Sequence, residues 1–233
     1  MNSNYARIGA AMGAVFVLAL IPAGILESSG ASGATDDPGI LANLQREPTI
    51  VNKVGFALAI LAFIAFLAFL GYLYRVLRRA EGPEGWLGTA ALAGGLLYLA
   101  IKVGSAAPIM ARSHRRHELT ADLARTLVDL NDAAFVVSGL MFGVFTAAAA
   151  ATCLAHRVLP RWLGWLGLIA GLLTIPAATV GMLDMASYNP MPFLAATTWT
   201  LIVSIVLTVR RRTAPADRES AASTVKAETA GRA

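Results

Sequence analysis

Long apolar runs separated by short polar segments organise this chain. Six of these runs approach the length of about 20 residues that a helix needs to cross the hydrocarbon core of a bilayer. They occupy residues 8–26, 54–74, 86–107, 133–155, 162–183 and 191–209. The pattern predicts an all-α fold, a polytopic integral membrane bundle of six transmembrane helices over residues 1–212. Residues 213–233, rich in Ala, Ser and charge, are predicted to form a disordered cytoplasmic tail.

The fourth run continues its helical pattern on the N-terminal side. The residues before it carry one apolar and one charged stripe at helical spacing, which is typical of a helix that lies partly in water. The apolar stripe consists of Leu119, Leu123, Leu127, Leu130 and Ala134, and the charged stripe consists of Asp122, Arg125, Asp129 and Asp132. We therefore expect one long helix over residues 117–157, extended beyond the membrane on the outer side.

Small residues recur every four positions along the fourth run, at Gly139, Gly143 and Ala147. Such a face lets another helix approach closely, so we expect it to be buried against a second helix. Gly9 and Gly13 form a similar pair in the first run. The first run has an alternative interpretation as a cleaved signal peptide, because one arginine precedes its apolar core and small residues follow it.

The segment between the first two runs is long and acidic. Asp37 and Pro38 are a favourable N-cap and first residue for a short helix that Pro48 ends. Two interpretations are open for this element, namely a helix at the membrane surface and a lid packed on the bundle.

The composition excludes a soluble globular protein. The chain is 57% hydrophobic and 14% charged, whereas a soluble domain carries about 25% charged residues. A sequence pI of about 9.8 does not indicate nucleic-acid binding, because the basic residues cluster at the ends of the apolar runs. A single cysteine, Cys153, excludes an internal disulfide framework. The excess of arginine over lysine fits a GC-rich bacterial gene.

The distribution of Lys and Arg between the two sides predicts the orientation. Basic residues with few acids gather on one side, at Arg7, Arg75, Arg78, Arg79, Arg157, Arg161 and Arg210–Arg212. The positive-inside rule makes that side cytoplasmic. We expect both termini in the cytoplasm and residues 27–52 and 112–118 outside, in a bacterial plasma (inner) membrane.

Lys102 is the one charge inside the third run. An ionisable residue at such a depth indicates a functional site and calls for a partner. Asp132 and Asp184 stand at the outer ends of the fourth and fifth runs, so either carboxylate is a candidate partner. Asp129 lies beside them as a further candidate. The alternative is that the Lys102 ammonium group snorkels to the membrane interface.

The segment before the fourth helix is strongly cationic. Together with Arg125, its side chains Arg112, Arg115 and Arg116 favour an anionic partner such as a lipid head group, a phosphate or a carboxylate. His114, His117 and Glu118 are weak candidates for metal ligands, and the neighbouring arginines oppose a cation. Histidines within the runs, which a haem would require, are absent from the sequence, and so are hydrolase and phosphate-loop motifs. We expect no catalytic residue and no cofactor.

Three short stretches are similar to a known family. They are Tyr72-Leu73-Tyr74-Arg75-Val76-Leu77, Leu127-Val128-Asp129-Leu130-Asn131-Asp132 and Leu159-Pro160-Arg161-Trp162-Leu163-Gly164. Over about residues 6–210 the chain resembles the bacterial six-helix membrane proteins grouped as domain of unknown function 4386. The resemblance implies a plasma-membrane bundle, and it implies no reaction, substrate or cofactor.

These observations favour a multi-pass plasma-membrane protein without catalytic activity. Its expected partners are the lipid bilayer, an anionic small molecule or lipid bound at the outer face, or another membrane protein, and not nucleic acid. The first alternative is a small-solute transporter that uses Lys102, Asp132 and Asp184 together with a kink at Pro176. The second alternative is a membrane-embedded enzyme.

Overall fold

The computed structural model describes residues 3–28, 41, 42, 45, 47–108, 110 and 118–230, with residues 3, 27, 28 and 211–230 described by their backbone alone. Its long helices are α1 (Ser3–Ser28), α3 (Ile50–Glu81), α4 (Leu87–Gly104), α6 (Ala121–Ala155), α7 (Arg161–Leu183) and α8 (Met191–Ala230). A short 3-10 turn, η2 (Met185–Ser187), follows α7. Six helices are long and apolar enough to cross a membrane, and the described residues include no strand. The chain therefore has the all-α, six-span fold that its sequence predicts.

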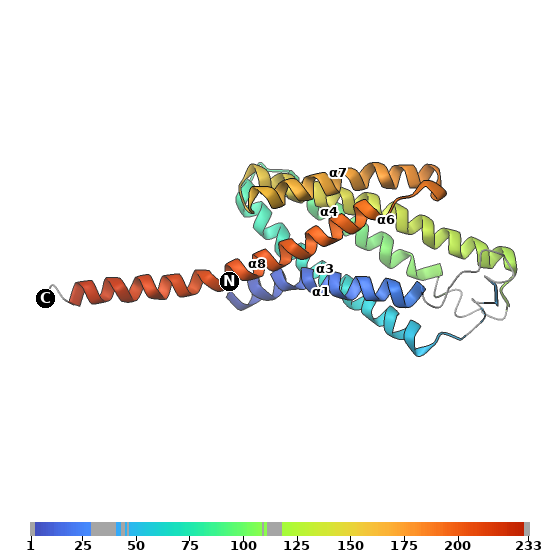
Figure 1. Ribbon diagram of the computed structural model, residues 1–233, viewed down its shortest axis with the longest axis horizontal. Helices are drawn as coiled ribbons and strands as arrows, with labels where there is room; N and C mark the ends of the chain where they lie inside the picture. Colours follow the sequence, from blue (N-terminus) through green and yellow to red (C-terminus); the bar gives the residue numbers. More distant parts are fainter. Residues whose placement is uncertain are drawn as a thin grey trace.

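The six helices form a closed ring. Each packs against the next along the chain, and α8 returns to pack against α1 (Figure 1). The order around the ring is therefore α1, α3, α4, α6, α7 and α8. This up-and-down arrangement follows from the short connections after α3, α6 and α7, because a short link leaves consecutive helices antiparallel and adjacent. α1 and α8 stand opposite the pair α4 and α6.

Two helix boundaries differ from the sequence prediction because polar residues continue or cap a helix. α3 begins at a capping box in which Thr49 and Asn52 each accept from the other's backbone N–H, at 3.3 and 3.1 Å. It extends past residue 74 through Arg78 and Arg79, since arginine is a good helix former and favours the C-terminal turn. α6 begins after Thr120, whose hydroxyl accepts from the Leu123 N–H at 3.4 Å, rather than at residue 117.

Aromatic side chains fill the centre of the ring. Phe16 of α1, Phe66 of α3, Tyr98 of α4 and Phe142 of α6 pack with ring centroids 4.6 to 6.4 Å apart. Phe193 of α8 joins them at 5.2 Å from Phe142. Because these rings are contributed by five of the six helices, the aromatic cluster ties the bundle together at its middle.

Small residues bring α6 and α7 into close contact. A Cβ atom added at Gly143 would lie 3.1 Å from the carbonyl oxygen of Gly171, and one added at Gly171 would lie 2.5 Å from the backbone nitrogen of Ala147. Gly139, Gly143 and Ala147 are all buried. The prediction that this face packs against another helix is therefore confirmed, and the partner is α7.

Two buried side chains join helices by hydrogen bonds. Ser204 of α8 donates to the carbonyl oxygen of Ala10 and accepts from the N–H of Ala14 at 2.8 Å, both in α1. The indole N–H of Trp199 in α8 donates to the carbonyl oxygen of Leu163 in α7 at 2.8 Å. Both helices adjoining α8 in the ring are thus held by a specific polar contact as well as by packing.

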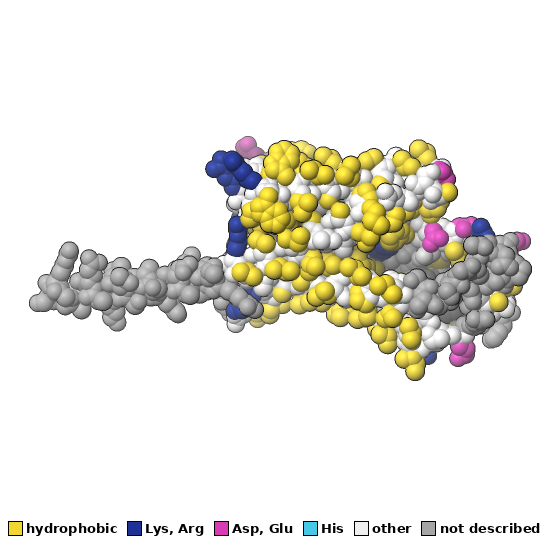
Figure 2. Space-filling model, in the orientation of Figure 1, with side chains coloured by type: hydrophobic (Ala, Val, Ile, Leu, Met, Phe, Trp, Pro, Cys, Tyr) yellow, Lys and Arg dark blue, Asp and Glu magenta, His cyan; other side chains and the backbone are white. Residues whose placement is uncertain are grey.

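The two ends of the bundle differ in charge. Lys and Arg gather at the end where α1 starts and the C-terminal extension of α8 leaves the ring, whereas most Asp and Glu lie at the opposite end (Figure 2). We call these the basic end and the acidic end. At the basic end, Arg78 donates to three carbonyl oxygens of the α3–α4 connection, and the Glu81 carboxylate caps α4 by accepting from Leu87 and Gly88.

Some predictions concern residues outside the described ranges. Of the short helix expected after Asp37, the structure describes Leu41, Ala42 and Gln45, and these are helical. The backbone of α8 continues as helix to Ala230. The domain boundary at residue 212 and the disordered tail stay predictions.

Candidate functional site

Lys102 lies in the last turn of α4, towards the acidic end of the ring. Its Nζ atom is 4.2 Å from the centroid of the Phe135 ring in α6. An ammonium group over an aromatic face is a cation–π contact, and such contacts are stronger where water is excluded. The side chain is half-buried, so Lys102 points towards a neighbouring helix rather than along the outside of the bundle.

Phe135 shows that this contact faces the interior of the ring. Its ring centroid lies 5.5 Å from that of Phe193, which comes from α8 on the far side of the ring, and 5.9 Å from that of Tyr188. Side chains from α4, α6 and α8 therefore meet around one phenyl ring. The ammonium group of the half-buried Lys102 therefore contacts a ring that packs against the core of the bundle, near its acidic end.

Tyr188 adds a polar group to the same surroundings. It follows η2 in the connection between α7 and α8, and its ring contacts Phe135 edge to face. Partial burial raises the pKa of the Tyr188 phenol above its ordinary value. The phenol therefore stays protonated at neutral pH and remains a hydrogen-bond donor.

Tyr98 lies one helical turn before Lys102 on α4. Its ring packs against Phe142 with centroids 4.9 Å apart, and the residue is fully buried. The hydroxyl oxygen has no hydrogen-bond partner among the described residues. A buried polar atom left in this state costs free energy, of order 1–3 kcal/mol, so its presence calls for an explanation.

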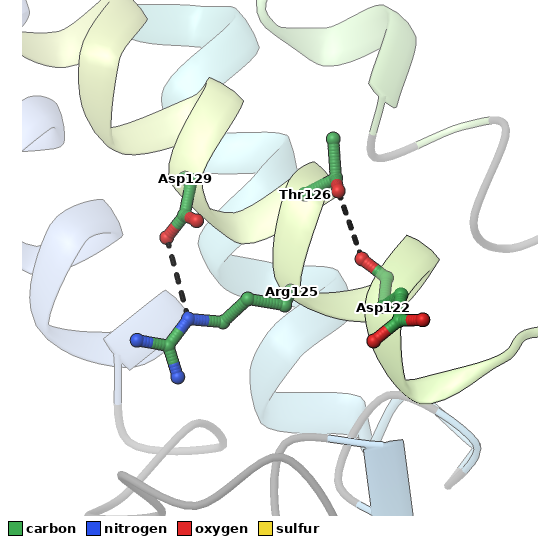
Figure 3. Close-up of polar contacts among 4 residues, drawn as sticks. All are labelled: Asp122, Arg125, Thr126 and Asp129. Carbon is green, nitrogen blue, oxygen red and sulfur yellow. Dashed lines mark hydrogen bonds and ion pairs between the residues drawn. The ribbon is translucent and has the colours of Figure 1, made fainter.

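The three candidate carboxylates, Asp184, Asp132 and Asp129, each contact a residue other than Lys102. Asp184 caps η2, because its carboxylate accepts from the Ala186 N–H at 3.1 Å and from the Ser187 hydroxyl. Asp132 accepts from the side-chain amide of Asn131 at 3.5 Å. Asp129 pairs with Arg125 across one turn of α6, with 3.7 Å between Oδ1 and Nε (Figure 3). Pairing of Lys102 with Asp132 or Asp184 stays a prediction.

The charged stripe of α6 is solvent-exposed at its start. Arg125 and Asp129 have side-chain exposures of 47% and 67%, so their ion pair contributes little stability. Asp122 lies beyond them towards the start of the helix, and its backbone carbonyl accepts from the Thr126 hydroxyl at 2.8 Å (Figure 3). Leu123 and Leu130 of the apolar stripe are exposed as well, so the division of this part of α6 into a water-facing and a buried side stays a prediction.

Two hollows flank α6 near the acidic end. One of about 370 Å³ lies between α6 and α7 and is lined by Asp129, Asp132, Val136, Gly181 and Met182, among others. The other, of about 540 Å³, lies between α4 and α6 and has mainly apolar walls, including Ile101, Pro108 and Leu130. The first brings the predicted acids Asp129 and Asp132 together and suits a cation better than an anion.

The cationic segment before α6 lies outside the described residues. This applies to Arg112, Arg115 and Arg116 and to the weak metal candidates His114 and His117. Glu118 is described and lies just before the N-cap of α6. The metal site and the anion-binding role of these arginines therefore stay predictions.

The comparison with protein families finds one family model that covers the whole bundle. A family model described as a domain of unknown function, DUF4386, matches residues 7–210. The chain belongs to this family. No curated protein and no solved structure matches it. The matched range begins within α1 and ends where the apolar part of α8 ends, so the DUF4386 region coincides with the six candidate spans.

Of the four residues described around this part of the DUF4386 protein, the sequence alone identified only Lys102 as a candidate. It did not identify Phe135, Tyr98 or Tyr188. Lys102 was identifiable because a charge interrupts an apolar run. Phe135, Tyr98 and Tyr188 carried no such signal, since aromatic residues are common in membrane helices. The usable signal was the spacing of four residues between Tyr98 and Lys102, which places both on one face of α4.

Proposed function

We propose that this DUF4386 protein is a non-catalytic bundle of a plasma membrane that binds an oxyanion inside the acidic end of its ring. The observation that carries the proposal is the position of the half-buried Lys102 ammonium group, 4.2 Å from the centroid of a Phe135 ring that packs against the core. Ionisable side chains within membrane helices are costly to place there and mark functional sites by default. A phosphate or carboxylate group would form charge-assisted hydrogen bonds with it.

The aromatic cluster favours binding over transport. Four fully buried rings fill the middle of the ring of helices, next to Lys102 and Phe135, namely Phe16, Phe66, Tyr98 and Phe142. A solute that entered from the acidic end would meet this cluster, and a transporter would have to part it in every cycle. Binding beside Lys102 leaves Phe16, Phe66 and Phe142 packed together and requires only local side-chain movement, so we favour it.

The charge difference between the ends supports an outward-facing site. The basic end carries the arginines Arg7, Arg78, Arg161 and Arg210, and basic ends of membrane proteins face the cytoplasm. In that orientation the end of α4 that carries Lys102 lies on the side of the outer leaflet. The bound oxyanion is then either the head-group phosphate of a lipid in that leaflet or a free anion from outside the cell.

The test is lipid binding by purified protein in detergent, measured by native mass spectrometry. Phosphatidylglycerol, phosphatidylcholine and inorganic phosphate are compared as ligands, using wild type, Lys102→Met and the control Lys53→Met. Lys53 is an exposed lysine in the first turn of α3. We expect Lys102→Met to weaken oxyanion binding roughly tenfold or more, because charge-assisted hydrogen bonds contribute about 1.5–3 kcal/mol.

The two sources of the oxyanion give different results. Preference for phosphatidylglycerol over inorganic phosphate identifies a lipid head group, and the reverse identifies a free anion. Lys53→Met should bind as the wild type does. Equal binding by wild type and Lys102→Met would overturn the proposed function.

A further inference from the structure

The hydroxyl group of Tyr98 is the least explained polar atom in the middle of the ring. It is buried, and it has no hydrogen-bond partner among the described residues. Phenylalanine would fill the same space without this cost, since the ring makes all the aromatic contacts. A partner for the hydroxyl in a ligand-bound state of the protein would account for a tyrosine at this position.

The neighbours of Tyr98 indicate where that partner comes from. Tyr98 and Lys102 are four residues apart on α4, and their contacts on α6, Phe142 and Phe135, are seven residues apart. Both spacings keep residues on one face of a helix. The two pairs therefore form consecutive layers inside the ring, with the Lys102 layer nearer the acidic end.

Tyr72 provides a comparison within the same molecule. Its hydroxyl is the other buried side-chain polar atom without a partner among the described residues. Tyr72 belongs to α3, and its Cβ lies beside Gly9 of α1, where a Cβ on the glycine would come within 2.8 Å. Among the described residues, the Tyr72 ring takes no part in the aromatic cluster that surrounds Tyr98. Removing either hydroxyl removes a buried polar atom without a partner, but only Tyr98 lies next to Lys102. Comparing the two tyrosines therefore shows whether an effect on binding depends on the position next to Lys102.

We infer that the Tyr98 hydroxyl donates a hydrogen bond to the oxyanion that Lys102 binds, an inference that rests on the proposed function. The ammonium group supplies charge at the entrance, and the phenol supplies a directional donor one turn deeper. Two donors of this kind suit the several oxygens of a phosphate group. Because Tyr98 is fully enclosed, the oxyanion reaches it when the Lys102 side chain lifts from Phe135 and opens the layer above.

The experiment compares Tyr98→Phe with Tyr72→Phe in the same binding measurement, with phosphatidylglycerol and inorganic phosphate as probes. Each substitution removes one oxygen atom and keeps the ring, so both variants should melt at or above the wild-type temperature in the absence of ligand. We expect Tyr98→Phe to weaken binding of the preferred probe roughly two- to tenfold, as for a neutral hydrogen bond. Tyr72→Phe should bind as the wild type does.

The outcomes separate this inference from the proposed function. Unchanged binding by Tyr98→Phe, alongside weaker binding by Lys102→Met, overturns the role of Tyr98 alone. Unchanged binding by Lys102→Met overturns the proposed function itself. Equal weakening by Tyr98→Phe and Tyr72→Phe also overturns the inference, because the effect would then come from the bundle as a whole.

Discussion

Ser204 shows how one hydroxyl group can fix the approach of two membrane helices. Its oxygen accepts from the Ala14 N–H at 2.8 Å and donates to the Ala10 carbonyl oxygen, so it bridges two backbone groups one turn apart on α1. Gly13 makes this approach possible, because a Cβ there would lie 2.9 Å from the Ser204 Cβ. Ser204 is separated from Ala14 and Ala10 by 190 and 194 residues along the chain, so these hydrogen bonds join the last helix of the bundle to the first and close the ring.

We expect Ser204→Ala to lower the free energy of unfolding by about 0.5–2 kcal/mol, the range for hydrogen bonds between membrane helices. Thermal denaturation of the protein in detergent measures this change. Thr198→Ala is the matched control on the same helix, because the exposed Thr198 hydroxyl donates to the Leu194 carbonyl oxygen within α8. An equal loss in both variants would mean that the bridge to α1 contributes nothing specific.

At the scale of elements, the contact between α6 and α7 depends on the absence of side chains. Gly143 faces the Gly171 carbonyl oxygen and Ile175 at distances of 3.0–3.2 Å from an added Cβ. Any larger residue must push α7 away, and overpacking of this kind costs about 1–3 kcal/mol. We therefore expect Gly143→Leu to lower the melting temperature of the purified protein clearly.

Gly71→Leu is the control for that substitution. Gly71 is an exposed residue inside α3, and an added Cβ there meets nothing within 4 Å. Leucine has a higher helix propensity than glycine, so Gly71→Leu should leave the melting temperature unchanged or raise it slightly. If Gly143→Leu melted like Gly71→Leu, the close packing of α6 on α7 would be refuted.

The helices of this fold were predictable from the sequence because the thickness of a bilayer sets the length of the apolar run that each spanning helix needs. All six runs became helices, and the small-residue face of α6 was recognised before its partner was known. Boundaries were less predictable, since Arg78 and Arg79 are polar residues inside a helix and Thr120 caps α6 by its side chain. The candidate site was found only at Lys102, because the sequence does not say which aromatic residues of other helices face it.

At the scale of the whole molecule, the helices alternate in direction around the ring, so the described helix ends fall into two groups. α3 and α6 end at the basic end, and α4 and α7 end at the acidic end (Figure 1). Arg210 reinforces the basic end by donating to the Val158 carbonyl oxygen at 3.0 Å, which joins α8 to the α6–α7 connection. Orientation in the membrane is therefore a single choice for the entire bundle.

We predict that the basic end faces the cytoplasm, because basic residues near the ends of spans are retained on that side. Single cysteines at positions 80 and 186 test this in intact cells with a membrane-impermeant maleimide, on a Cys153→Ala background. Both positions are exposed alanines, Ala80 near the end of α3 and Ala186 in η2, whereas Cys153 is buried. The cysteine at 186 should react from outside, and the one at 80 only after the membrane is permeabilised. Labelling of position 80 in intact cells would show that the orientation is the opposite one, with the Lys102 layer on the cytoplasmic side.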